Sequence, residues 1–117
     1  RCASLGMSAI KTPLVRHPPL VLLVALRDDL ARACTHAIAP LPIMRAASAS
    51  TAVERLPIVR PLMVIASSDL SETDRAMLAE RAADVLAEMV TVSLQEDHIE
   101  LGARLKTAAR TAETRRG

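Results

Sequence analysis

Four acidic side chains lie in or just after apolar runs of the sequence and are candidates for binding a cation jointly. Asp28 and Asp29 follow one apolar run, Asp69 follows a second, and Glu88 lies within a third. Open parallel sheets bind ligands at the carboxyl ends of their strands, and carboxylates are the usual protein ligands of Mg²⁺ and Ca²⁺. These four residues are therefore the candidate cation site. In the alternative interpretation Asp28 caps a helix and the other three are solvated.

Serine and histidine residues raise the question of nucleophilic catalysis. Ser67, Ser68 and Asp69, with one of the three histidines, would supply the residue types of a hydrolase triad. The nucleophile-elbow motif G-x-S-x-G is absent, as are G-x-G-x-x-G and the P-loop, and the chain has only three glycines. We therefore predict that the protein is not an enzyme and does not hydrolyse nucleotides.

Strands and helices are expected to alternate along the chain and to position these side chains. Apolar runs predict strands at 19–26, 43–47, 62–66 and 85–92. Helices are expected to begin at Asp28, within 48–51 with a Thr51 and Glu54 capping box, at Ser71 and at Asp97. This order predicts an α/β three-layer sandwich, with helices on both faces of a central parallel sheet of four to five strands.

Helical spacing of apolar residues predicts which helix faces are buried. The helix after Ser71 is expected to face the sheet with a small-residue stripe: Ala76, Leu78, Ala79, Ala82 and Ala83. The last helix is expected to bury Ile99, Leu101, Leu105 and Ala108. Cys34 falls on the apolar face of its helix and is expected to be a buried, inert thiol.

Composition limits the number of domains and the kinds of partner. The 117 residues fit one domain at 19–117, preceded at 1–18 by an N-terminal arm or an expression remnant. The chain has no aromatic residue, so it lacks the stacking platforms that bind single-stranded nucleic acid and the cages that bind cations. Its 15 basic residues are scattered among 13 acidic ones, which argues against direct nucleic-acid binding.

Hydropathy and residue usage predict the cellular setting. The longest apolar run spans the seven residues 20–26, too few to cross a membrane. The first residues lack the apolar core of a secretory signal, and two cysteines are too few for a disulfide framework. The arginine- and alanine-rich composition is typical of a GC-rich bacterium. We expect a bacterial, cytoplasmic protein.

Three stretches of the chain resemble the response-regulator receiver domain, which has a flavodoxin-like fold. Residues 21–30 read V-L-L-V-A-L-R-D-D-L, like the family's first strand and turn. Residues 46–65 resemble the segment from its second to its third strand, and A-D-V-L-A-E-M-V at 83–90 looks like its closing strand. The likeness covers about 19–110 and implies a receiver-like fold and a place in two-component signal transduction.

The chain departs from this family at the positions that react. A receiver binds a divalent ion through acids ending its first strand, accepts phosphate on an aspartate ending its third, and contacts the phosphate through a Ser or Thr and a Lys. The matching positions here are Ala25 and Leu26, Ser67 as a degenerate phosphoacceptor, and Glu88 in place of the Lys. A hydroxyl cannot form an acyl phosphate, and a carboxylate repels a phosphoryl group. The resemblance thus implies that phosphorylation chemistry is lost.

Only four strand-helix units fit in this chain, whereas a receiver has five. Either the third helix and fourth strand are missing, or residues 62–67 are the fourth strand and Ser67 or Ser68 is the family's hydroxyl residue. A sheet that lacks one strand leaves an edge exposed, which favours self-association or partner docking.

Two functional hypotheses follow. The leading one is a non-enzymatic signalling and regulatory module, a pseudo-receiver without a cofactor, which binds a protein partner or forms a homodimer through its last strand and adjacent helices. The alternative is a phosphorylation-competent or small-ligand-binding regulator, in which Asp69 accepts phosphate and Asp28 and Asp29 bind Mg²⁺.

Overall fold

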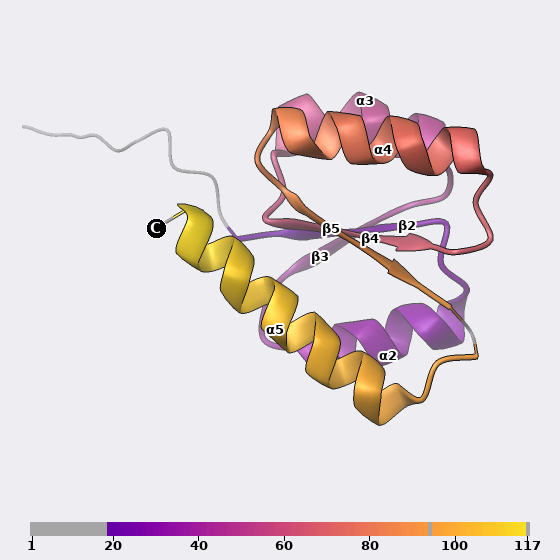
Figure 1. Ribbon diagram of the computed structural model, residues 1–117, viewed down its shortest axis with the longest axis vertical. Helices are drawn as coiled ribbons and strands as arrows, with labels where there is room; N and C mark the ends of the chain where they lie inside the picture. Colours follow the sequence, from indigo (N-terminus) through magenta and orange to yellow (C-terminus); the bar gives the residue numbers. More distant parts are fainter. Residues whose placement is uncertain (1–18, 94, 117) are drawn as a thin grey trace, which may run out of the picture.

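The computed structural model describes residues 19–93 and 95–116, in which strands and helices alternate (Figure 1). The strands are β2 (Val21–Val24), β3 (Ile43–Ala46), β4 (Met63–Ser67) and β5 (Glu88–Val92). The helices are α2 (Asp28–Ile38), α3 (Ala49–Val59), α4 (Glu72–Asp84) and α5 (His98–Arg116). The predicted alternation is confirmed, and the arm predicted at 1–18 lies outside the described residues.

The strands form one parallel sheet in the order β3-β2-β4-β5. Counted along the described chain, this order is 2-1-3-4, which matches the first four places of the flavodoxin-like order 2-1-3-4-5. Because β4 lies directly beside β2, it occupies the third position, and Ser67 ends that strand. The described sheet therefore has four strands, with β3 and β5 at its edges.

Helices cover both faces of the sheet, α2 and α5 on one side and α3 and α4 on the other (Figure 1). On β2, Val21 and Leu23 face α2 and α5, whereas Leu22 and Val24 face α3 and α4. A strand with both faces covered requires a continuous apolar run, which is why the central position of β2 is readable in the sequence. The predicted three-layer sandwich is confirmed.

Two of the predicted helix caps differ from the structure. Helix α4 begins as expected, because Ser71 Oγ accepts a hydrogen bond of 3.1 Å from the backbone N–H of Asp74. The cap of α3 is Ser48 rather than Thr51, since Ser48 Oγ accepts from the N–H of Thr51 at 3.2 Å. The N-cap of α2 is Arg27, without a side-chain bond, so the prediction that Asp28 caps this helix is wrong.

The predicted buried faces are partly wrong. In α4 only Leu78 and Ala82 are buried, and the predicted small-residue stripe is otherwise at the surface because α4 meets the sheet along a narrow face. In α5, Leu101 and Leu105 are buried as predicted, but Ile99 in the first turn is 82% exposed. No helix among residues 19–93 and 95–116 has the length and apolar character needed to span a bilayer.

Candidate functional site

Asp28 and Asp29 lie in the first turn of α2, beyond the carboxyl end of β2. The Asp28 carboxylate binds Arg45 of β3, with Nη1 and Oδ1 3.0 Å apart, and Arg45 also donates from Nη2 to the carbonyl oxygen of Leu26 at 2.7 Å. Asp29 Oδ1 accepts from the backbone N–H of Leu30 at 2.9 Å. Arginine thus already neutralises Asp28, and a cation would have to compete with it.

Ser67 lies at the carboxyl end of β4 and is only 7% exposed. Its Oγ accepts a hydrogen bond of 3.1 Å from the backbone N–H of Asp69, which fixes the turn that follows the strand. The neighbouring Ser68 donates its N–H to the carbonyl oxygen of Val92 at 2.8 Å and joins this turn to the end of β5. The Ser67 hydroxyl is therefore buried and accepts a hydrogen bond that stabilises the turn. Asp69 itself is exposed at the surface.

Glu88 lies at the opposite end of the sheet from these residues. It is the first residue of β5 and pairs in register with Met63, the first residue of β4. Its carboxylate forms an ion pair with Arg115 of α5 at 2.8 Å. The prediction that Glu88 joins the other acids is wrong, because parallel strands place their amino ends together and away from their carboxyl ends. For the same reason Glu88 does not occupy the position of a receiver's lysine.

The predicted four-acid cation site is consequently not assembled. Asp28, Asp29 and Asp69 remain near the carboxyl edge, but the described part of the chain contains no group of three or more His, Cys, Asp or Glu residues placed to hold a metal. These residues do not fit the divalent ion that a receiver binds at this edge.

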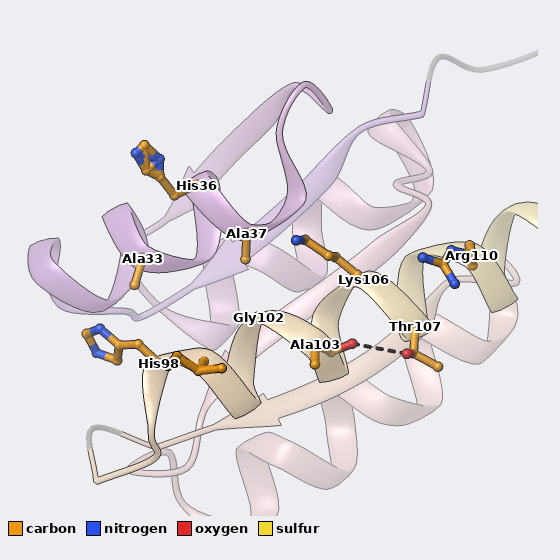
Figure 2. A pocket seen from close by; sticks show the side chains of 10 residues that line it. Ala33, His36, Ala37, His98, Gly102, Ala103, Lys106, Thr107 and Arg110 are labelled. Atoms are coloured by element: carbon orange, nitrogen blue, oxygen red, sulfur yellow. Dashed lines mark hydrogen bonds between the residues drawn. The ribbon is translucent and has the colours of Figure 1, made fainter.

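A groove of about 760 Å³ runs between α2 and α5 (Figure 2). Its floor consists of small residues, and basic and imidazole groups stand around it: the lining residues include Ala33, Ala37, Gly102 and Ala103, with His36, His98, Lys106 and Arg110. Figure 2 shows His36 and His98 near one end of the groove, with Lys106 extending toward α2. No acidic residue lines the groove. No local sequence pattern predicted this groove, although a glycine within a helical stretch, Gly102, is a signal of close helix packing.

A second groove, of about 750 Å³, lies between the edge strand β5 and α5. Its α5 side is lined mainly by small residues, namely Ala103, Thr107, Ala108 and Thr111, together with Arg104. Arg104 Nη2 contacts both the Glu96 carboxylate at 2.7 Å and the carbonyl oxygen of Thr91 at 2.9 Å. The exposed sheet edge that the sequence predicted is therefore present at β5, within the described residues.

Cys34 is fully buried between α2 and the sheet, as predicted. The pKa of its thiol is raised from 9.0 to about 11, mainly by burial and further by the Glu96 carboxylate, whereas Arg104 acts in the opposite direction. A buried thiol with a raised pKa is a poor nucleophile at neutral pH.

Comparisons with known proteins identify the fold. No protein-family model matches the sequence, and no curated protein sequence matches it. Among solved structures, the chain is similar to the crystal structure of a signal receiver domain from Vibrio parahaemolyticus, with a TM-score of 0.53 and 16% sequence identity. The match covers 84% of this chain and 95% of that one. The predicted receiver-like fold is thereby confirmed.

Proposed function

We propose that this receiver-like chain is a non-enzymatic signalling and regulatory module, a pseudo-receiver that acts through contact with a protein partner or a second copy, without aspartyl phosphorylation. The observation that carries the proposal is Ser67, which ends the strand in third position, where a receiver has its phosphoacceptor aspartate. A serine hydroxyl cannot form an acyl phosphate. The fold supports a place in bacterial, cytoplasmic two-component signalling.

The surroundings of Ser67 support the same proposal. Ser67 is 7% exposed, and its Oγ already accepts a hydrogen bond from the N–H of Asp69. A phosphoryl donor would have to open this turn to reach the hydroxyl, and the adjacent carboxyl end of β5, at Thr91 and Val92, carries no lysine to bind the negative phosphoryl group. The described carboxyl edge therefore offers a poor site for phosphoryl transfer.

The residues of the carboxyl edge also argue against a cofactor. A receiver's ion needs several carboxylate or carbonyl oxygens converging on one point. Here Arg45 neutralises Asp28, and Asp29 accepts a backbone N–H. The proposal therefore includes no bound Mg²⁺.

Helix α5 offers the surfaces for protein contact. It borders both grooves described above, one shared with α2 and one with β5. The α2–α5 groove combines a floor of small residues with basic side chains such as Lys106 and Arg110, a combination suited to an acidic protein segment. Regulation by docking requires such surfaces and no reacting group.

A backbone amide NMR titration tests the proposal. Mg²⁺ is added first and then beryllofluoride, a mimic of the acyl phosphate, while the signals of 25–29, 67–69 and Glu88 are followed beside those of an ordinary receiver. We expect the control receiver to respond and this chain to show no saturable shift. A Mg²⁺-dependent, saturable shift confined to 25–29 and 67–69 would overturn the proposal and support the alternative regulator, with Asp69 as acceptor.

Substitutions separate the carboxyl edge from the docking surface. Ser67→Ala is expected to leave regulatory activity intact. The double reversal Lys106→Glu with Arg110→Glu is expected to abolish partner binding, because it inverts the charge of the α2–α5 groove. Arg32→Glu is the matched control, since Arg32 is an exposed residue of α2 outside the lining of that groove. Loss of activity from Ser67→Ala in a protein that still folds would count against the proposal.

A further inference from the structure

The backbone of β5 directs alternate residues toward β4 and toward the open edge of the sheet. Glu88 donates its N–H to the carbonyl oxygen of Leu62 at 3.1 Å, and the carbonyl oxygen of Val92 accepts from Ser68 at 2.8 Å. Both residues therefore face β4. In a parallel ladder the residues between them point the other way, so Met89 and Thr91 present their backbone groups to the open edge.

Some backbone groups on this edge already have partners within the chain. The carbonyl oxygen of Thr91 accepts from Arg104 Nη2 at 2.9 Å, and the N–H of Ser93 donates to Glu96 Oε1 at 3.0 Å. At the other end, the N–H of Ala87 donates to the carbonyl oxygen of Ala82 at 2.8 Å. Hydrogen bonds within the protomer thus already occupy the Ala87 N–H at one end of the edge and the Thr91 carbonyl oxygen and Ser93 N–H at the other.

The groups that remain open form a short, self-complementary set. They are the carbonyl oxygen of Ala87, the N–H and carbonyl oxygen of Met89, and the N–H of Thr91, none of which meets a further strand within the described sheet. In an antiparallel pair centred on Met89, each Met89 N–H faces the partner's Met89 carbonyl oxygen. Each Thr91 N–H then faces the carbonyl oxygen of the partner's Ala87. Such a pair makes four hydrogen bonds from the open groups alone.

The groups already in use fit the same arrangement. A regular antiparallel ladder would add a bond from the Ala87 N–H to the carbonyl oxygen of the partner's Thr91. Both groups already have a partner within their own chain: the Ala87 N–H donates to Ala82, and the Thr91 carbonyl oxygen accepts from Arg104. Pairing one residue further along, centred on Val90, would instead require the Thr91 oxygen that Arg104 occupies. The internal bonds therefore favour the register centred on Met89.

The side chains around this edge leave room for a second strand and supply apolar surface. The β5–α5 groove is lined on its helix side mainly by small residues such as Ala108 and Thr111. Leu86, in the turn just before β5, is 61% exposed and adds apolar surface beside the open edge. Pairing would remove this apolar surface from water.

From these observations we infer that a second copy of this chain docks on β5, and that the two β5 strands pair antiparallel about Met89. The pairing joins the two described sheets into one. A two-fold axis closes the arrangement, because both copies use the same β5 edge. This inference rests on the proposed function and deepens it, because it assigns the β5 edge to a second copy and leaves the α2–α5 groove to a different protein partner.

Edge-specific proline variants test the pairing in solution. Sedimentation velocity of the full chain at micromolar concentration is expected to show a dimer. Met89→Pro removes an N–H that points away from β4, so the protomer keeps its ladder, yet the dimer dissociation constant should rise by about tenfold or more. Ile43→Pro is the matched control at the opposite sheet edge, where residue 43 also points outward because Pro42 faces β2. A monomeric wild-type protein, or a dimer insensitive to Met89→Pro, overturns the inference.

Cysteine cross-linking tests the register in a Cys2→Ser background, in which Cys34 is buried. Residues 89 of the two copies would lie about 5.5 Å apart between Cα atoms, within disulfide range, so Met89→Cys should form a covalent dimer on oxidation. Residues 91 would be separated by four residues along the strands, about 13 Å, so Thr91→Cys should not. Cross-linking through Thr91→Cys but not Met89→Cys overturns the register.

The failure of this inference is distinguishable from failure of the proposed function. If the protein is a monomer and does not respond to beryllofluoride, the pairing is wrong but the proposed function stands, with a different protein as the partner. A dimer with the predicted cross-link and a clear beryllofluoride response leaves the pairing in place and overturns the proposed function.

Discussion

Arg104 of α5 donates from Nη2 to the carbonyl oxygen of Thr91 in β5 at 2.9 Å, and thereby ties the last helix to the edge of the sheet. The same nitrogen contacts the Glu96 carboxylate at 2.7 Å, and that carboxylate accepts the N–H of Ser93. One arginine and one glutamate thus satisfy two backbone groups at the end of β5. Because these backbone groups already have partners, another strand can pair with this sheet edge in fewer registers.

This network predicts a measurable coupling between Arg104 and Glu96. Arg104→Ala should lower the free energy of unfolding by about 1 kcal/mol, and Glu96→Ala by about 1 to 2 kcal/mol because it also leaves the Ser93 N–H without its acceptor. The double variant should cost at least about 0.5 kcal/mol less than the sum of the two. Urea unfolding at one fixed protein concentration measures all three values.

The control for this cycle is Arg110→Ala, on the same helix. Arg110 is exposed and has no ion pair within residues 19–93 and 95–116, so its loss should change stability by less than about 0.5 kcal/mol. Strict additivity of the Arg104 and Glu96 variants would contradict the network.

The cap of α3 supplies a second prediction. Ser48→Ala should lower the free energy of unfolding by about 1 kcal/mol, because Ser48 Oγ accepts the Thr51 N–H at the helix start. Glu54→Ala should change it by less than about 0.5 kcal/mol, since Glu54 is an exposed residue beyond the first turn. Thermal or urea unfolding compares the two. A larger effect at Glu54 would restore the capping box that the sequence pattern suggested.

Some features of the structure were readable in the sequence and others were not, for physical reasons. The run at 19–26 indicated a central strand because β2 is buried on both faces, and burial of both faces leaves a continuous apolar signal. The segment 85–92 indicated a strand as well, but its first residues form a turn. Leu86 adopts a left-handed conformation with φ 59°, and the Ala87 N–H closes back on Ala82. The strand therefore begins at Glu88.

That local turn places Glu88 away from the other three acids of the candidate cation site. With Glu88 at the start of β5, the four acids cannot converge, although Asp28, Asp29 and Asp69 were correctly placed near strand ends. An apolar pattern predicts that a strand exists but carries little information on where it starts. The two grooves beside α5 depend on how that helix lies on its neighbours, which no local pattern encodes.

Cys34 gives the protein a predictable dependence on alkaline pH. Burial is the main reason that its pKa rises from 9.0 to about 11 in the folded state. The unfolded chain therefore loses this proton first, so this contribution to stability is complete below about pH 9 and is lost as pH rises to about 11. The loss amounts to at most about 3 kcal/mol. The chain has no tyrosine and only two lysines, which leaves few other groups titrating in this window.

Comparison of the wild-type protein with Cys34→Ala isolates this effect. The variant loses packing at every pH, so the informative quantity is the change in the free energy of unfolding between about pH 8 and pH 11. We expect that change to be smaller in Cys34→Ala than in the wild type by about 2 to 3 kcal/mol. Equal changes in the two proteins would show that the thiol ionises as readily in the folded chain as in the unfolded one.

Gly102 in α5 faces Ala37 of α2 across the floor of the α2–α5 groove (Figure 2), and a methyl group added there has space. A Cβ atom at position 102 would lie 3.6 Å from the Ala37 Cβ, an ordinary van der Waals contact. Glycine in a helix interior costs about 0.5 to 1 kcal/mol relative to alanine, so Gly102→Ala should raise the free energy of unfolding by about that amount. Ala103→Gly, at the next position of the same helix, is the matched control and should lower it similarly. Urea unfolding distinguishes the signs, and destabilisation by Gly102→Ala would mean that α2 and α5 approach more closely than this contact allows.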